Sequence, residues 1–172
     1  MRTCRSLTVI LVALPALLLG GCWTQTDSVS IGRDGVMEFV SSIVVDDQPQ
    51  QLKVADIEKA SQEYMDGLIQ AGWTVTRAWV SQTRPYTLRF TGRGNLKSVR
   101  GASAFYELTK LSDTELRIRF LPGERQGLKS VRSIAFTPPA QGAGATVVDA
   151  AGKPVSRIDR VDGSKAYTIR LE

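Results

Sequence analysis

Six basic residues lie in or just before two stretches of the chain that share one five-residue sequence. Leu-Lys-Ser-Val-Arg occurs at residues 96–100 and again at 128–132, and an arginine precedes each leucine by three positions. Guanidinium forks and ammonium groups near glycines and free backbone N–H groups suit phosphate or carboxylate ligands. The pattern predicts an anion-binding site made of Arg93, Lys97, Arg100, Arg125, Lys129 and Arg132.

Two alternatives stay open for these residues. Alternating cations on strands are also what the solvated face of a half-buried sheet looks like. The repeated sequence is either a decayed duplication or a coincidence between segments of different structure, since two copies are too few for a solenoid.

The six residues belong to a basic middle segment. Arg77–Arg132 holds twelve Lys and Arg against four Asp and Glu, whereas Cys22–Thr76 holds three against nine. The net charge of the whole chain is only +5 at pH 7, which does not call for nucleic acid. Anions of this kind include lipid head groups, lipopolysaccharide phosphates and cell-wall carboxylates.

Catalysis has few candidate residues. The chain contains no histidine, which excludes Ser-His and Cys-His mechanisms and the common zinc sites. No Ser-x-x-Lys sequence occurs, and the carboxylates at 46–47 and 159–162 lack the spacing of a calcium loop. We therefore expect a protein that is not an enzyme and that uses neither a metal nor another cofactor.

The N-terminal residues have the layout of a secretory signal peptide. Arg2 and Arg5 precede an apolar stretch from Leu7 to Leu19, which ends at two glycines and a cysteine. That stretch is shorter than the roughly 20 residues of a membrane-spanning helix. Leu19-Gly20-Gly21-Cys22 resembles the lipobox of bacterial lipoproteins, in which the signal is cut off before the cysteine and the thiol receives a diacylglycerol.

The lipobox resemblance implies a lipid anchor on Cys22. It divides the chain into a cleaved signal at 1–21, a lipidated cysteine with a polar tether at 22–28, and a single domain at 29–172. A diacylglycerol with a further amide-linked acyl chain would hold the protein firmly on a membrane. Because Trp23 rather than Asp follows the cysteine, the resemblance favours the outer membrane, facing the periplasm, in a host with two membranes. In other hosts it favours the outer face of the plasma membrane.

The rest of the chain predicts strands in pairs and one helix. Apolar residues recur at helical spacing from Val54 to Ala71, and Gly72 stands where such a helix would end. Segments rich in β-branched residues, separated by turn residues, predict strands at 29–31, 36–45, 73–80, 86–90, 105–111, 114–121, 131–137, 146–148 and 166–171. The expected fold class is α+β, a mostly antiparallel sheet of successive hairpins with one amphipathic helix packed on one face.

Three short motifs resemble the LppM-type domain of bacterial lipoproteins. They are Asp34-Gly35 between the first strands, Ala71-Gly72-Trp73 at the helix exit and Leu88-Arg89-Phe90 in the next hairpin. The resemblance implies an envelope module that binds a lipid or a glycolipid, and it transfers no individual functional residue.

The sequence therefore predicts a non-enzymatic, lipid-anchored envelope protein that binds an anionic lipid or glycolipid head group through residues 77–132. The alternative is a structural or assembly subunit that docks on another envelope protein through exposed aromatic residues such as Trp79 or Tyr86.

Overall fold

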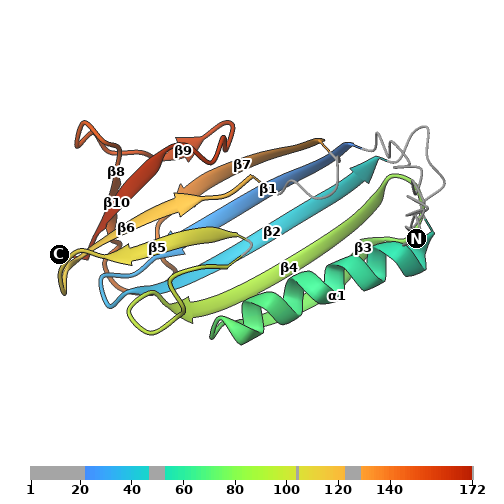
Figure 1. The fold of residues 1–172 in the computed structure, drawn as a ribbon, viewed down its shortest axis with the longest axis horizontal. Coiled ribbons are helices and arrows are strands. Elements are labelled where there is room, and N and C mark those ends of the chain that lie inside the picture. The colour runs from blue at the N-terminus through green and yellow to red at the C-terminus, as the bar shows by residue number, and fades with distance from the viewer. Residues whose placement is uncertain (1–21, 47–52, 104, 123–128, 172) are drawn as a thin grey trace, which may run out of the picture.

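The α+β class is confirmed, and the strands form two sheets (Figure 1). The computed structural model describes residues 22–46, 53–103, 105–122 and 129–171. The elements are β1 (Cys22–Ile31), β2 (Val36–Asp46), α1 (Val54–Gln70), β3 (Thr74–Ser81), β4 (Tyr86–Asn95), β5 (Tyr106–Lys110), β6 (Glu115–Phe120), β7 (Lys129–Thr137), β8 (Thr146–Val148), β9 (Arg157–Ile158) and β10 (Ala166–Arg170).

The predicted hairpins β1–β2, β3–β4 and β5–β6 all form, but the prediction of one sheet is wrong. The large sheet has the order β3-β4-β2-β1-β7-β9, and the small sheet has the order β5-β6-β10-β8. β7 runs parallel to β1, with Cys22 opposite Lys129 and Ser30 opposite Thr137. Turn residues reveal only pairing between neighbours in sequence, so nothing in the local pattern indicated a partner so far along the chain.

The predicted tether at residues 22–28 is also wrong, because this stretch is the first part of β1. Hydrogen-bonded pairing with β2 begins at Cys22, which stands opposite Asp46. Successive side chains alternate between the faces of the strand, so Gln25 and Asp27 point into the core and are buried. The composition is typical of a polar linker, but two of its polar side chains, Gln25 and Asp27, are buried and bonded to each other and to Ser41 and Arg132.

Asp27 forms a buried ion pair with Arg132 of β7. The Arg132 Nε donates to Asp27 Oδ2 at 2.6 Å, and the two side chains are 2% and 1% exposed. Gln25 Nε2 donates to Asp27 Oδ1 at 3.0 Å and to Ser41 Oγ at 3.1 Å. These bonds satisfy the carboxylate inside a core where an unpaired charge would be costly.

Arg132 also fastens the small sheet to the large one. Its Nη1 donates to two backbone carbonyls, Phe105 O at 2.9 Å and Leu121 O at 2.8 Å. Those residues lie just before β5 and just after β6. The guanidinium also stacks on the Phe105 ring, 4.0 Å from its centroid. One side chain therefore holds β1, β7 and both ends of the β5–β6 hairpin in register.

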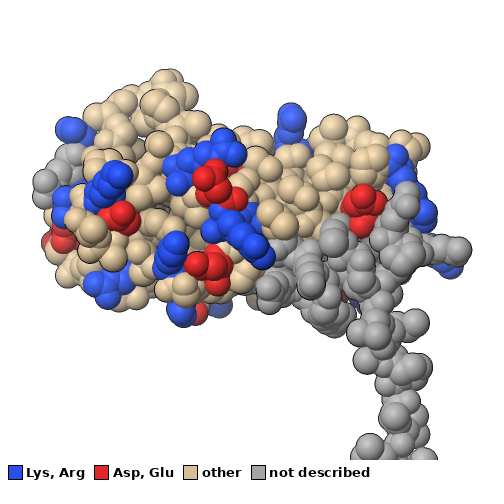
Figure 2. Space-filling model, turned by 90° about the horizontal axis from the view of Figure 1, so that it is seen from above, with Lys and Arg blue, Asp and Glu red and all other residues tan. Residues whose placement is uncertain are grey.

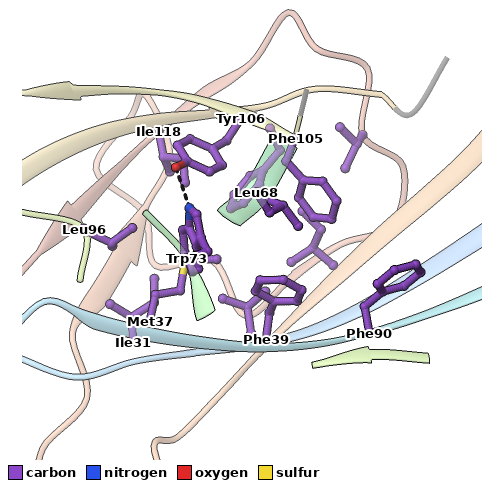
Figure 3. Packing of buried hydrophobic residues seen from close by; sticks show 14 of the residues in the cluster. Ile31, Met37, Phe39, Leu68, Trp73, Phe90, Leu96, Phe105, Tyr106 and Ile118 are labelled. Atoms are coloured by element: carbon purple, nitrogen blue, oxygen red, sulfur yellow. Dashed lines mark hydrogen bonds between the residues drawn. The ribbon is translucent and has the colours of Figure 1, made fainter. Parts of the chain in front are cut away.

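The helix α1 covers the inner face of the large sheet along β3 and β4 (Figure 1). Its buried residues Ile57, Ser61 and Leu68 follow the predicted stripe, and Gly72 takes the positive φ of 96° after the helix end. Beyond it, the Trp73 Nε1 donates to the Tyr106 hydroxyl at 2.7 Å, which bridges the two sheets (Figure 3). Burial raises the pKa of that hydroxyl.

Removing one member of the buried ion pair should be far more costly than removing an exposed one. We expect Asp27→Ala to lower the free energy of unfolding by about 3–5 kcal/mol, because it leaves Arg132 buried and unpaired. Glu107→Ala, which breaks the half-exposed pair with Arg119, should cost at most about 1 kcal/mol. Denaturant unfolding of the 22–172 segment measures both. Equal losses would contradict the assigned role of Asp27.

Two glycines should respond to alanine in opposite directions. A Cβ at Gly92 would overlap the Phe39 ring packed on the backbone, so Gly92→Ala should destabilise the protein by about 1–3 kcal/mol. Gly67 lies on α1 with nothing within 4 Å of an added Cβ. Gly67→Ala should therefore stabilise the protein by about 0.5–1 kcal/mol through helix propensity. Thermal unfolding of the pair distinguishes the two effects by their sign.

Candidate functional site

Among the described residues, the cations predicted to bind an anion do not come together in one site. Arg93 ends up opposite Glu38 and Thr74, at the end of the large sheet farthest from Cys22, while Lys129 stands directly opposite Cys22. β1 spans ten residues, which is about 30 Å. Lys97 and Arg100 follow β4 at the far end, where the backbone N–H of Leu96 bonds to Gly35 O. Arg125 lies outside the described residues.

The prediction is wrong for Arg132, which is buried and bonded to Asp27 as described above. Arg93 is exposed but forms an ion pair with Glu38 at 3.5 Å. The two copies of the repeated sequence also differ in conformation. Residues 96–100 form a turn, whereas the described part of the second copy, residues 129–132, lies in β7. This outcome agrees with coincidence rather than with a pair of equivalent loops.

Four basic side chains line another pocket, but carboxylates in and beside this pocket offset their charge. The pocket lies against the small sheet, toward the end of the molecule opposite Cys22, and has a volume of about 850 Å³. Arg117, Arg157, Lys165 and Arg170 line it. Arg157 pairs with Asp159 and Arg170 with Glu115, and Asp149 is also part of the lining.

Carboxylates beside this pocket offset its cations. Burial raises the pKa of Tyr167, and the negative charges of Asp162 and Asp149 raise it further. Hydrogen bonds from the Ser164 backbone N–H and hydroxyl hold the pKa of Asp162 below its usual value, and the charge of Lys165 lowers it further. Figure 2 shows the same mixture on the face that it draws, with basic and acidic side chains next to one another. We find no basic patch there that would select an anion.

An apolar cavity lies between α1 and the large sheet, and we name it the α1 cavity. Its volume is about 130 Å³, and almost all of its surface is carbon. It is lined by Asp56, Ile57, Ala60, Ser61 and Tyr64 of α1 and by Trp23, Ile43, Val45, Leu88 and Phe90 of the sheet. Enclosed apolar cavities of about this size accept small hydrocarbon ligands, and the α1 cavity has a similar volume but is partly open to solvent.

The cavity lies at the end of the sheet where β1 begins. Trp23 follows Cys22 directly and stands opposite Val45, and Val45 stands opposite Tyr86 at the start of β4. Small side chains on one face of the helix, Ala60 and Ser61, leave the space between helix and sheet unfilled. The Trp23 indole nitrogen is buried there and has no hydrogen-bond partner within the described part of the structure.

One cation of the basic segment reaches the wall of the cavity. The Arg77 Nη1 donates to Ser61 Oγ at 2.5 Å and to Glu58 O at 3.1 Å. The guanidinium has further N–H groups besides this nitrogen, and Arg77 is only half-buried. Arg77 was not among the six predicted cations, because its position in an alternating strand gave no sign that it faced the helix.

Trp79 and Tyr86, which the sequence predicts to be exposed docking residues, are not exposed. Tyr86 is buried, and Trp79 is half-buried with its Nε1 donating to Glu58 Oε1 at 3.2 Å. Among the described residues, no three His, Cys, Asp or Glu side chains gather as metal ligands would. None of the described helices is both long and apolar enough to cross a membrane.

Comparison with known proteins adds no relative. No protein-family model matches the chain, and no curated protein matches it. The lipobox at Cys22 and the likeness to LppM-type domains therefore stay predictions from the residues quoted for them.

Proposed function

We propose that this chain is a non-enzymatic, lipid-anchored protein of the bacterial envelope that binds an anionic lipid or glycolipid. Part of an acyl chain of that lipid occupies the α1 cavity, and the apolar lining of the cavity is the observation that carries the proposal. The lipid anchor is Cys22. In a host with two membranes, Trp23 at the following position favours the outer membrane.

The cavity suits a hydrocarbon chain better than a polar ligand. Each methylene group removed from water contributes about 0.8 kcal/mol, and the one charged residue of the lining, Asp56, is exposed in the first turn of α1. Groups that could meet the polar part of a lipid lie at its wall. The Trp23 N–H would gain an acceptor oxygen, and Arg77 could bond to a phosphate or carboxylate.

The anchor is tested by changing the cysteine. Cys22→Ser should abolish labelling of the full-length protein by radioactive palmitate in a bacterial host and leave the signal uncleaved by the lipoprotein peptidase. Wild-type protein should carry the label and sediment with the membranes. Labelling that persists in Cys22→Ser would overturn the assignment of Cys22, whatever the cavity binds.

The cavity is tested by filling it. Ala60→Leu places a larger side chain at the wall without harming the helix, whereas Ala55→Leu makes the same change at an exposed position of α1 outside the lining. The ligands are dihexanoylphosphatidylglycerol and dihexanoylphosphatidylcholine below their micelle concentrations. The protein is the 22–172 segment, which contains every described element, with its Ile, Leu and Val methyl groups labelled for NMR.

We expect phosphatidylglycerol to shift the methyl signals of Ile43, Val45, Ile57 and Leu88 and to leave Ile118 and Ile169 of the small sheet unchanged. Ala60→Leu should weaken binding at least about tenfold, which is 1.4 kcal/mol, and Ala55→Leu should not. Arg77→Gln should reduce the preference for phosphatidylglycerol over phosphatidylcholine. Shifts spread over both sheets, or equal binding by the two leucine variants, would sink the proposal.

A further inference from the structure

The lack of a tether places a second surface close to the proposed anchor. The first strand pairs with β2 and with β7 from Cys22 onward, so no flexible residues separate the cysteine from the folded sheet. If acyl chains on Cys22 enter a bilayer, as the proposed function holds, the adjacent end of the large sheet must lie near the lipid head groups.

A row of uncharged side chains crosses the outer face of the sheet at this end. The outer face is the one opposite α1. Thr24 stands opposite Val44 on one side and Val131 on the other, Val44 stands opposite Thr87, and Val80 lies at the bulge of β3 beside Thr87. We call Thr24, Val44, Val80, Thr87 and Val131 the outer row. It is about 7 Å from Cys22 along β1, which is two residues.

The outer row carries two of the exposed large apolar side chains of the described residues. Val80 and Val131, at its two sides, are 56% and 48% exposed. The described side chains of the row contain no charge; on the same face, exposed Asp46 stands opposite Cys22, and Arg89, Arg93 and Glu38 lie farther from it. Uncharged β-branched residues can enter the boundary between head groups and acyl chains, where a charged residue would be costly.

We infer that the outer row is a membrane-contact surface that lies against the bilayer into which Cys22 is anchored. The α1 cavity opens on the inner face of the same end of the sheet. The end of the sheet nearest the bilayer therefore presents a surface contact on one face and a site for an acyl chain on the other. The inference rests on the lipid anchor of the proposed function and does not depend on binding in the cavity.

Two native tryptophans serve as reporters. Trp79 lies at the Cys22 end, opposite Leu88, and Trp73 lies next to Thr74, which stands opposite Arg93 at the far end. The lipidated mature protein is reconstituted in phosphatidylcholine and phosphatidylglycerol vesicles that contain dibrominated phosphatidylcholine, a short-range quencher. One variant keeps only Trp79 (Trp23→Phe, Trp73→Phe) and the other keeps only Trp73 (Trp23→Phe, Trp79→Phe). Both also carry Ala60→Leu, which fills the α1 cavity, because Trp79 lies on the cavity side of the sheet and bromolipid in the cavity would quench it.

We expect bromolipid to quench Trp79 at least twofold and to leave Trp73 unquenched. Val80→Asp with Val131→Asp should bring the quenching of Trp79 close to that of Trp73. Val40→Asp is the matched control, because Val40 is 42% exposed on the same face and stands opposite Ser28, six residues or about 20 Å along β1 from Cys22. It should leave the quenching unchanged.

Flotation of the vesicles separates the possible failures. Protein that floats with vesicles but shows equal quenching of Trp79 and Trp73 overturns the membrane-contact surface and leaves the anchor intact; crosslinking through Val80 would then test a protein partner. Protein that does not float overturns the anchor and, with it, the inference. An effect of Val40→Asp as large as that of the double variant would also contradict the surface.

Discussion

The two sheets depend on a single charged side chain that the core has fully enclosed. Arg132 bonds to Asp27 across the parallel pair β1–β7 and to the carbonyls that flank the β5–β6 hairpin. Buried ion pairs often contribute little net stability, because desolvation offsets the attraction between the charges. Their directional bonds nevertheless fix register. In this protein they join two segments whose partners stand 105 residues apart in sequence, and they add a specific bonded register to the one that the buried face of the strands already favours.

Local patterns in the sequence were enough for the helix and the hairpins and not enough for their assembly. The stripe from Val54 to Ala71 and the Asp34-Gly35 turn predict α1 and β1–β2, because helix spacing and turn chemistry are encoded by adjacent residues. The tether failed for a physical reason. Gln25 and Asp27 are polar residues that are usually exposed to solvent. They can be buried because their side chains bond to each other, to Ser41 and to Arg132.

Local patterns also do not predict which distant residues meet. For this reason the cations of the predicted anion site lie apart in the structure, and the α1 cavity was not predicted. A count of cations along the chain does not indicate which of them will meet, and antiparallel strands carry neighbours in sequence to opposite ends of a sheet. The cavity exists because the side chains of Ala60 and Ser61 are small and leave space that Leu or Phe would fill. Small residues on a helical stripe could have suggested a gap, but its location depends on which strands the helix covers.

The parallel pairing of β1 with β7 also governs when the protein can fold. β1 lies inside the large sheet, between β2, which follows it at once, and β7, which comes only after α1 and four further strands. During synthesis from the N-terminus, the β1–β2 hairpin therefore precedes its other neighbour, with one edge of β1 unpaired and with Asp27 lacking its cation. The large sheet closes only when residues 129–137 have been added to the chain. Whatever acts on the N-terminal part of the chain before that point meets a first strand that lacks half of its hydrogen bonds.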